Sequence, residues 1–168
     1  SNKAKSILIF CNMKIKCDQL ADDLYALGLD VLTLHSDLEQ KQRDETIILF
    51  SNKSYPILIA TDVASRGLHI EDVDLVINYD LSLDEKIHTH RIGRTARAGK
   101  GGLAVSLYTQ NDLDRYDIIK DTFPDIQEED VSKIEDDLSY KIDSPQRTIF
   151  INGGKKQKLR AGDILGAL

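Results

Sequence analysis

The chain has 168 residues, 41% apolar and 30% charged, a composition that is typical of one soluble domain and excludes a chain disordered throughout. No apolar run approaches the roughly 18 residues of a membrane span, and the first residues lack the sectors of a signal peptide, so we expect a cytoplasmic protein without a membrane partner. The formal charge of −6 would repel nucleic acid at long range, so an anionic partner must meet a local basic patch.

Short apolar runs alternate with amphipathic stretches along the first three quarters of the chain. This alternation predicts βα units around a parallel sheet. In chain order we expect a strand at 6–10, a helix at 14–27 stopped by Gly28, a strand at 31–35, a helix at 39–50 whose apolar side carries Ile47, Ile48 and Phe50, a strand at 57–60, a polar loop at 61–72, a strand at 75–79, a polar segment at 88–102, a strand at 103–108 and a helix at 111–123.

The composition changes after Pro124. We expect a compact domain over residues 1–124, an acidic linker over 125–147 with a short helix around 131–138, and the truncated start of a second domain over 148–168. In this last part RTIFINGG predicts a strand and AGDILGAL the beginning of a helix, which together cannot bury a core. The chain is therefore interpreted as a piece of a longer protein, with a docked tail as the alternative.

The segment HRIGRTARAG, residues 90–99, carries three arginines at positions i, i+3 and i+6. On a helix this spacing would keep Arg91, Arg94 and Arg97 near one face, and a guanidinium fork suits phosphate oxygens. The alternative is a solvated basic face that pairs with the abundant acids. Small neighbours such as Gly93 would allow another surface to approach closely, which favours an anionic ligand.

A second motif, ATDVASRGLHI at residues 60–70, directly follows a predicted strand. Thr61 offers a hydroxyl and an amide, Arg66 a charge, and Gly67 close approach of the main chain. Loops at the carboxyl ends of parallel strands bind ligands in α/β folds, which favours a phosphate contact over a loop without a ligand.

Cysteine and histidine positions do not predict a metal site. Five residues separate Cys11 from Cys17, and no CxxC pair or histidine cluster lies nearby, so the two cysteines are interpreted as buried thiols rather than a disulfide framework or a zinc site. His88 and His90 are alternate residues, which do not share a helix face, and neither has a Cys or an acid at zinc spacing.

Four separated blocks together resemble, in order and spacing, the second RecA-like domain of DEAD-box RNA helicases: ILIFCN at 7–12, QKQR at 40–43, ATDVASRGLHI and HRIGRTARAG. The resemblance covers residues 4–123 and implies an α/β RecA-like parallel sheet with helices on both faces, as in P-loop NTPases. The tail FINGGKKQKLRAGDILGAL is similar to the opening of the extra RNA-binding domain of DbpA-type helicases, which resembles an RNA-recognition motif.

The resemblance implies a nucleotide site shared with a second domain. ATP with Mg²⁺ would lie between this domain and the N-terminal RecA-like domain of the same protein. Arg94 and Arg97 resemble arginine fingers that contact the γ-phosphate, His90 resembles the residue that links the motif to the partner domain, and Arg91 both supports the preceding loop and belongs to the nucleotide set. His69 stands where the family has an acid near the ATP ribose, so that contact departs from the family pattern.

RNA contacts are implied in two places. Arg43, Thr61, Asp62 and Gly67 resemble the set that holds the RNA sugar-phosphate backbone without reading sequence. The second place is a basic cluster in the tail, which consists of Lys155, Lys156, Lys158 and Arg160. The resemblance implies that this cluster would tether the helicase to structured ribosomal RNA of the large subunit during ribosome assembly. The alternative interpretation is a plain surface loop.

Two motifs of a complete helicase are missing. The chain has neither GxxxxGK[ST] nor DEAD, so the phosphate loop and the Mg²⁺ carboxylates are expected in the other domain, and the isolated chain is expected to be inactive. Two alternatives remain: a DNA helicase of the same superfamily, which HRIGRTARAG and the RGL loop disfavour, and a non-catalytic RNA-binding or protein-interaction module that retains the fold.

Overall fold

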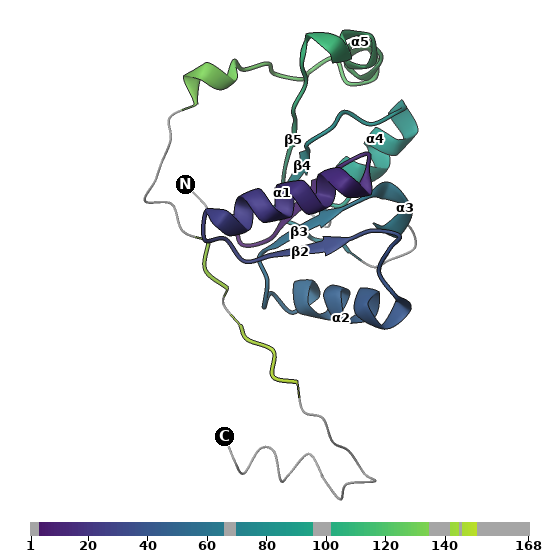
Figure 1. Ribbon diagram of the computed structural model, residues 1–168. Helices are drawn as coiled ribbons and strands as arrows, with labels where there is room; N and C mark the ends of the chain where they lie inside the picture. Colours follow the sequence, from purple (N-terminus) through teal and green to yellow (C-terminus); the bar gives the residue numbers. More distant parts are fainter. Residues whose placement is uncertain (1–3, 66–69, 96–101, 135–141, 145, 151–168) are drawn as a thin grey trace, which may run out of the picture.

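Five parallel strands form one sheet with helices on both faces, which confirms the expected α/β fold (Figure 1). The computed structural model describes residues 4–65, 70–95, 102–134, 142–144 and 146–150. The elements are β1 (Ile7–Phe10), α1 (Lys14–Ala26), β2 (Val31–Leu34), α2 (Gln40–Ser51), β3 (Ile57–Ala60), α3 (Asp62–Ser65), β4 (Leu75–Asn78), α4 (Glu85–Ile92), β5 (Leu103–Ser106), the 3₁₀ turn η1 (Gln110–Asp112), α5 (Leu113–Thr122) and the 3₁₀ turn η2 (Val131–Lys133).

The strand order is β2-β3-β1-β4-β5, so β1 lies between β3 and β4. Every residue of β1 and β3 is buried, as expected for central strands covered on both faces. Alternate residues face opposite sides: Leu8 and Phe10 pack in the cluster that includes Phe50 of α2, whereas Ile7 and Ile9 pack in the cluster that includes Cys17 of α1. The predicted burial of both thiols is confirmed, since Cys11 is also fully buried.

The ends of α1 and α2 follow from local sequence. Gly28 has φ +80°, the left-handed conformation that glycine adopts after the end of a helix, and it stops α1 as expected. The expectation for α2 is wrong at Ile48, which is 57% exposed. Thr46 and Phe50 are buried instead, because residues four apart lie on one face of a helix and Ile48, midway between them, points away.

The polar segment after β3 begins with one helical turn, α3, where the sequence predicted a loop. The Ser65 amide donates to the Thr61 carbonyl at 3.1 Å, and the Ser65 hydroxyl donates to the Asp62 carbonyl at 3.1 Å. An acid in the first turn favours a helix start, and Asp62 occupies that place. The turn fixes Thr61 and Asp62 directly at the end of β3.

The described part of the acidic segment lies against the domain. The Glu128 carboxylate accepts hydrogen bonds from the hydroxyls of Tyr108 and Tyr116 and from the Lys120 ammonium. Further on, Ile142 packs against the cluster around α1. The domain boundaries at 124 and 147 remain predictions.

The predicted secondary structure of the last quarter differs in two places. The short helix expected around 131–138 is a 3₁₀ turn over Val131–Lys133 followed by extended Ile134, and its remaining residues lie outside the described part. The strand expected in RTIFINGG is not formed at residues 147–150, because no described strand pairs with them. The predicted helix beginning in AGDILGAL also lies outside the described residues.

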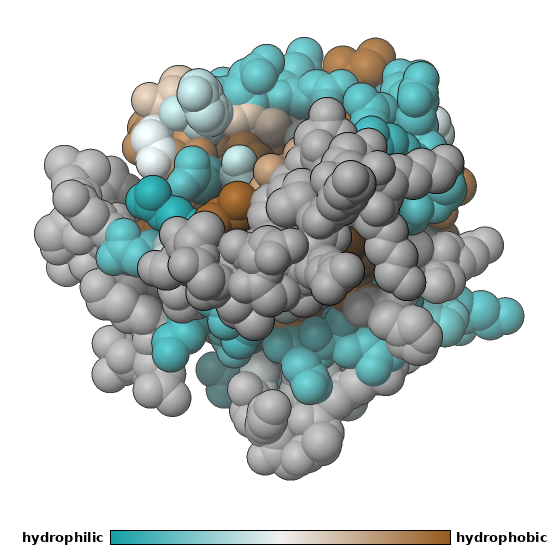
Figure 2. All heavy atoms as spheres, turned by 90° about the horizontal axis from the view of Figure 1, so that it is seen from below, coloured by the Kyte–Doolittle hydropathy of each residue, from teal (hydrophilic) through white to brown (hydrophobic). Residues whose placement is uncertain are grey.

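Seen from below, the described residues that are visible show hydrophobic side chains between hydrophilic ones (Figure 2). None of the helices in the described ranges is long and apolar enough to cross a membrane.

Candidate functional site

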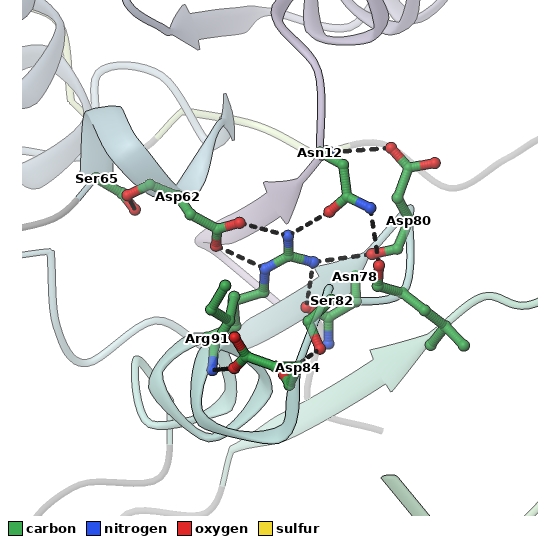
Figure 3. Close-up of polar contacts among 10 residues, drawn as sticks. Asn12, Asp62, Ser65, Asn78, Asp80, Ser82, Asp84 and Arg91 are labelled. Atoms are coloured by element: carbon green, nitrogen blue, oxygen red, sulfur yellow. Dashed lines mark hydrogen bonds and ion pairs between the residues drawn. The ribbon is translucent and has the colours of Figure 1, made fainter. Parts of the chain in front are cut away.

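Three neighbouring strands end beside one another at the carboxyl edge of the sheet. Asn12 lies two residues after β1, Asp62 two residues after β3 and Asp80 two residues after β4. Because β1 lies between β3 and β4, the three side chains lie close together although they are far apart in sequence. The helix α4 follows β4 and brings Arg91 into the space among them (Figure 3).

Arg91 donates all five of its guanidinium hydrogens within the domain. Its Nε and Nη2 bind Asp62 Oδ1 and Oδ2, both at 2.7 Å, as a two-toothed ion pair. Nη1 donates to the Asp80 carbonyl at 2.8 Å and contacts Asn78 Oδ1 at 3.4 Å, and Nη2 also donates to Asn12 Oδ1 at 2.7 Å. The side chain therefore joins the ends of β1, β3 and β4 to α4.

Arg91 is 1% exposed, and its guanidinium carbon lies 5.2 Å from the centre of the Phe10 ring. A buried charge needs paired and hydrogen-bonded surroundings, and the ring adds a favourable cation-π contact. The sequence assigns Arg91 both to support of the loop and to the nucleotide. In this structure every donor of its guanidinium serves the first role.

Asn12 fixes the loop after β1 through two further hydrogen bonds. Its backbone N–H donates to Asp80 Oδ2 at 3.0 Å, and its side-chain Nδ2 donates to the Leu81 carbonyl at 2.9 Å. Asp80 is also paired with the Lys16 ammonium of α1. The contacts of Arg91 are thus held by a second set of bonds that limits movement at the edge of the sheet.

Arg43 and Thr61, two residues predicted to contact RNA, are near the same α3 turn. Arg43 Nη2 donates to the Ala64 carbonyl at 3.1 Å, and the Thr61 amide donates to the Leu34 carbonyl at 3.1 Å. Arg43 Nε is buried and has no hydrogen-bond partner among the described residues. The structure therefore groups Arg43, Thr61 and Asp62 around the α3 turn.

Arg91 and Arg94 of HRIGRTARAG do not lie on the face of one helix, which corrects the expectation from their spacing, and Arg97 lies outside the described residues. The helix α4 ends at Ile92 and Gly93 is its C-terminal cap, so Arg94 lies in the turn that follows. The Val73 amide donates to the Arg94 carbonyl at 3.2 Å, and Arg94 Nη1 lies 3.5 Å from the Ile70 carbonyl. Arg94 is half-buried beside the residue that follows His69.

The two histidines of α4 have different surroundings. His90 is exposed, as a residue that contacts another domain has to be. His88 is buried, and its ring lies 5.6 Å from the Phe123 ring of α5. Burial and then the positive charge of Arg91 lower the pKa of His88 below its ordinary value of 6.5, which favours the neutral ring.

Several predicted site residues lie outside the described part of the chain. They are Gly67, His69, Arg97, Lys155, Lys156, Lys158 and Arg160. Their proposed contacts with ATP or RNA remain predictions.

Sequence reasoning missed Asn12, Asn78 and Asp80 as members of the site. Each is polar, and each stands at or just after the end of a predicted strand, which is the place where α/β folds collect functional side chains. If the polar residues at the end of every predicted strand had been counted as candidates, Asn12, Asn78 and Asp80 would have been included. Their joint contact with Arg91 depends on the strand order, which the sequence does not show.

The model of the helicase conserved C-terminal domain matches residues 1–99. The chain belongs to this family of helicase C-terminal domains. It is 42% identical over 167 residues, 99% of its length, to the ATP-dependent RNA helicase DbpA of Escherichia coli, and 36% identical over 184 residues, 97% of its length, to DbpA of Bacillus subtilis. It spans 36% and 38% of the lengths of these two relatives.

Solved structures of DEAD-box proteins have the same fold as this helicase C-terminal domain. The C-terminal domain of the DEAD-box protein Dbp5 is 34% identical with a TM-score of 0.68, and the match covers 75% of this chain and 74% of that one. The resemblance to the second RecA-like domain of DEAD-box helicases of the DbpA type is thereby confirmed, and so is the RecA-like fold.

Proposed function

We propose that this domain is the C-terminal half of an ATP-dependent RNA helicase, which binds RNA at the carboxyl edge of its sheet and ATP between itself and an N-terminal RecA-like domain. The five hydrogen bonds of Arg91 carry the proposal. They join Asp62 of the predicted RNA-binding motif to α4, the helix that precedes Arg94. A displacement of either segment would therefore shift the other.

The surroundings of Arg94 fit a nucleotide. Its guanidinium lies beside the carbonyl of Ile70, the residue that follows the predicted ribose ligand His69 in the sequence. ATP, when bound, supplies a phosphoryl group that transfers to water. Arg94 and Arg97 would stabilise the charge that develops on that group, an effect worth about 10³ to 10⁵ in rate.

Mg²⁺ would be held by carboxylates of the N-terminal domain. No group of three or more His, Cys, Asp or Glu side chains in the described ranges has the arrangement of a metal site. The Asp62 carboxylate is already bound by Arg91 through both oxygens, which suits a positioning role better than metal ligation.

RNA is proposed to lie over α3 and the start of α2. The half-buried side chain of Arg43 and the side chain of Thr61 would contact phosphates, and such contacts give affinity without sequence specificity. The DbpA-like basic cluster Lys155–Arg160 supports structured ribosomal RNA of the large subunit as the target, in ribosome assembly.

The test is RNA-stimulated ATP hydrolysis by the full-length protein carrying Arg94→Ala or Arg97→Ala. Each variant should lose at least about 100-fold in turnover while RNA binding is retained. Arg115→Ala is the matched control, since Arg115 is a half-exposed arginine paired with Asp112 on a different helix. Turnover equal to that of the parent in both finger variants would contradict the proposed mechanism.

The isolated chain should not hydrolyse ATP, because the phosphate loop would be supplied by the other domain. A full-length protein that binds RNA but does not hydrolyse ATP even in its parent form would support the alternative, a non-catalytic RNA-binding or protein-interaction module with this fold.

A further inference from the structure

The strand β2 forms one edge of the sheet, since β3 is its single neighbour among the described strands. The Thr61 amide donates to the Leu34 carbonyl at 3.1 Å, so the main-chain polar groups of Leu34 face β3. These groups point to opposite sides in successive residues of a strand, so those of Val31 and Thr33 point away from β3. Such outward N–H and C=O groups are a template for a further strand.

A groove of about 430 Å³ follows this edge. Its floor is β2, one side is lined by Ala21 and Tyr25 of α1, and the other is lined by Leu49 of α2. Figure 1 shows β2 between these two helices. Tyr25 is 74% exposed, so its ring is open to a ligand. The groove therefore offers apolar contacts on both faces of a strand that pairs with β2.

Each side of the groove also carries an acid, Asp22 on α1 and Glu45 on α2, and both are exposed. The described residues that line the groove include no Lys, Arg or His. Glu45 lies 3.8 Å from Lys41 in an exposed pair, which neutralises it weakly. RNA phosphates would be repelled here, and a second copy of this edge would bring acids against acids. The charge therefore favours a basic polypeptide segment.

We propose that the β2 edge binds an extended peptide segment of a protein partner, which adds a strand to the sheet and carries apolar side chains between Lys or Arg residues. Main-chain bonds to Val31 and Thr33 give affinity, and alternate side chains lie against α1 and α2. The four residues of β2 span about 13 Å, which about five peptide residues cover. The groove contains none of the residues assigned to ATP or RNA, so the inference goes beyond the proposed function and does not depend on it.

The first test measures amide hydrogen exchange by NMR on the full chain without ligands. The Thr33 amide should exchange at least about tenfold faster than those of Leu32 and Leu34, which face β3. Equal protection of the three amides would overturn the free edge.

The second test uses a fluorescein-labelled peptide of about nine residues, in which alternating Val and Thr lie between two Lys at each end. The chain should bind it saturably and the Thr33 amide should become protected. The same peptide with Glu in place of Lys should bind at least about tenfold more weakly. No saturable binding of the Lys peptide at about 1 mM, or equal binding of both peptides, would overturn the site.

Asp22→Asn combined with Glu45→Gln should weaken binding of the Lys peptide about fivefold, through the loss of two charge pairs. The matched control is Asp23→Asn combined with Asp44→Asn, which removes two exposed acids of the same helices that do not line the groove. The control should bind like the parent. Equal losses in the two variants would assign binding to net charge and overturn the groove.

Methylation of the peptide amides tests strand addition itself. A strand pairs along one edge through every second residue, so methylation of alternate amides should leave binding intact, whereas methylation of all central amides should cost at least about tenfold. The same loss from both peptides would overturn strand addition.

Competition identifies the other occupants. A single-stranded RNA of about 10 nucleotides should not displace the Lys peptide, and displacement would reassign the groove to RNA. Sedimentation of the chain alone should show no dimer that the peptide dissociates. Such a dimer would reassign the edge to a second copy of the chain.

Discussion

Arg91 and Asp62 form a two-toothed ion pair, with both N–O distances at 2.7 Å, between a helix and a strand end that are 29 residues apart. Arg91 is 1% exposed and the side chain of Asp62 is 22% exposed, so solvent screens the pair weakly. The pair joins the motif predicted to contact RNA to the helix that precedes the predicted arginine fingers. We therefore expect the contact to affect the stability of the domain and the relative position of the two segments.

Arg91→Lys should lower the free energy of unfolding by about 3 kcal/mol, because lysine keeps the charge but cannot bind both oxygens of Asp62 and also reach Asn12. Denaturant unfolding of the chain measures the change. Arg115→Lys, at an exposed pair with Asp112, should change the value by less than about 0.5 kcal/mol. Equal effects of the two substitutions would show that the buried pair contributes no more than a surface pair.

His88 should make the domain less stable in mild acid. Its folded-state pKa is lowered by burial and by Arg91, so below its ordinary value of 6.5 the unfolded chain binds a proton that the folded domain does not. Stability is thus fully present above that value and falls as the pH falls toward the lower folded-state pKa. Unfolding free energies at about pH 7.5 and about pH 5.5 measure the loss.

His88→Phe is the variant that isolates this effect, because it keeps an aromatic ring against Phe123 and removes the titrating group. Its stability should fall less than that of the parent between the two pH values. An identical fall in both proteins would assign the acid sensitivity to other groups.

Glu128→Gln should release the acidic segment from α5. The ammonium of Lys120, followed by the hydroxyls of Tyr116 and Tyr108, lowers the pKa of Glu128 to about 2, which shows that these contacts favour the carboxylate. The contribution is therefore present above the ordinary value of 4.5 and is lost as the pH falls toward about 2. Hydrogen exchange of residues 125–134 at neutral pH should be faster in the variant.

Glu129→Gln is the control for that experiment, since it removes a neighbouring charge that makes none of these three bonds. If both variants exchange at the same rate, the segment is held by its general charge rather than by Glu128.

His69→Asp should modestly tighten ATP binding by the full-length protein. A carboxylate accepts hydrogen bonds from ribose hydroxyls more strongly than a neutral imidazole does, and the family has an acid at this position. A fluorescent-nucleotide titration measures the affinity. An unchanged or weaker affinity would show that His69 does not face the ribose.

The local pattern of the sequence was sufficient for most elements of the sheet. Strands such as Ile57–Ala60 are continuous apolar runs that only a doubly covered strand buries completely, and α1 ends where Gly28 supplies a left-handed residue. The pattern failed where a tertiary contact decides the outcome. Arg91 and Arg94 have helical spacing, but α4 ends at Ile92. The turn after it is fixed because the Val73 amide donates to the Arg94 carbonyl and the Thr95 hydroxyl donates to the Val73 carbonyl.

The sequence by itself determined the family, the alternation of strands and helices, and the motifs that carry Asp62 and Arg91, because these depend on local patterns and on hydrophobic periodicity. Only the tertiary structure decided which side chains meet. The placement of β1 between β3 and β4 brings Asn12, Asp62 and Asp80 around Arg91, and strand order arises from contacts between residues distant in the chain, which no local pattern records.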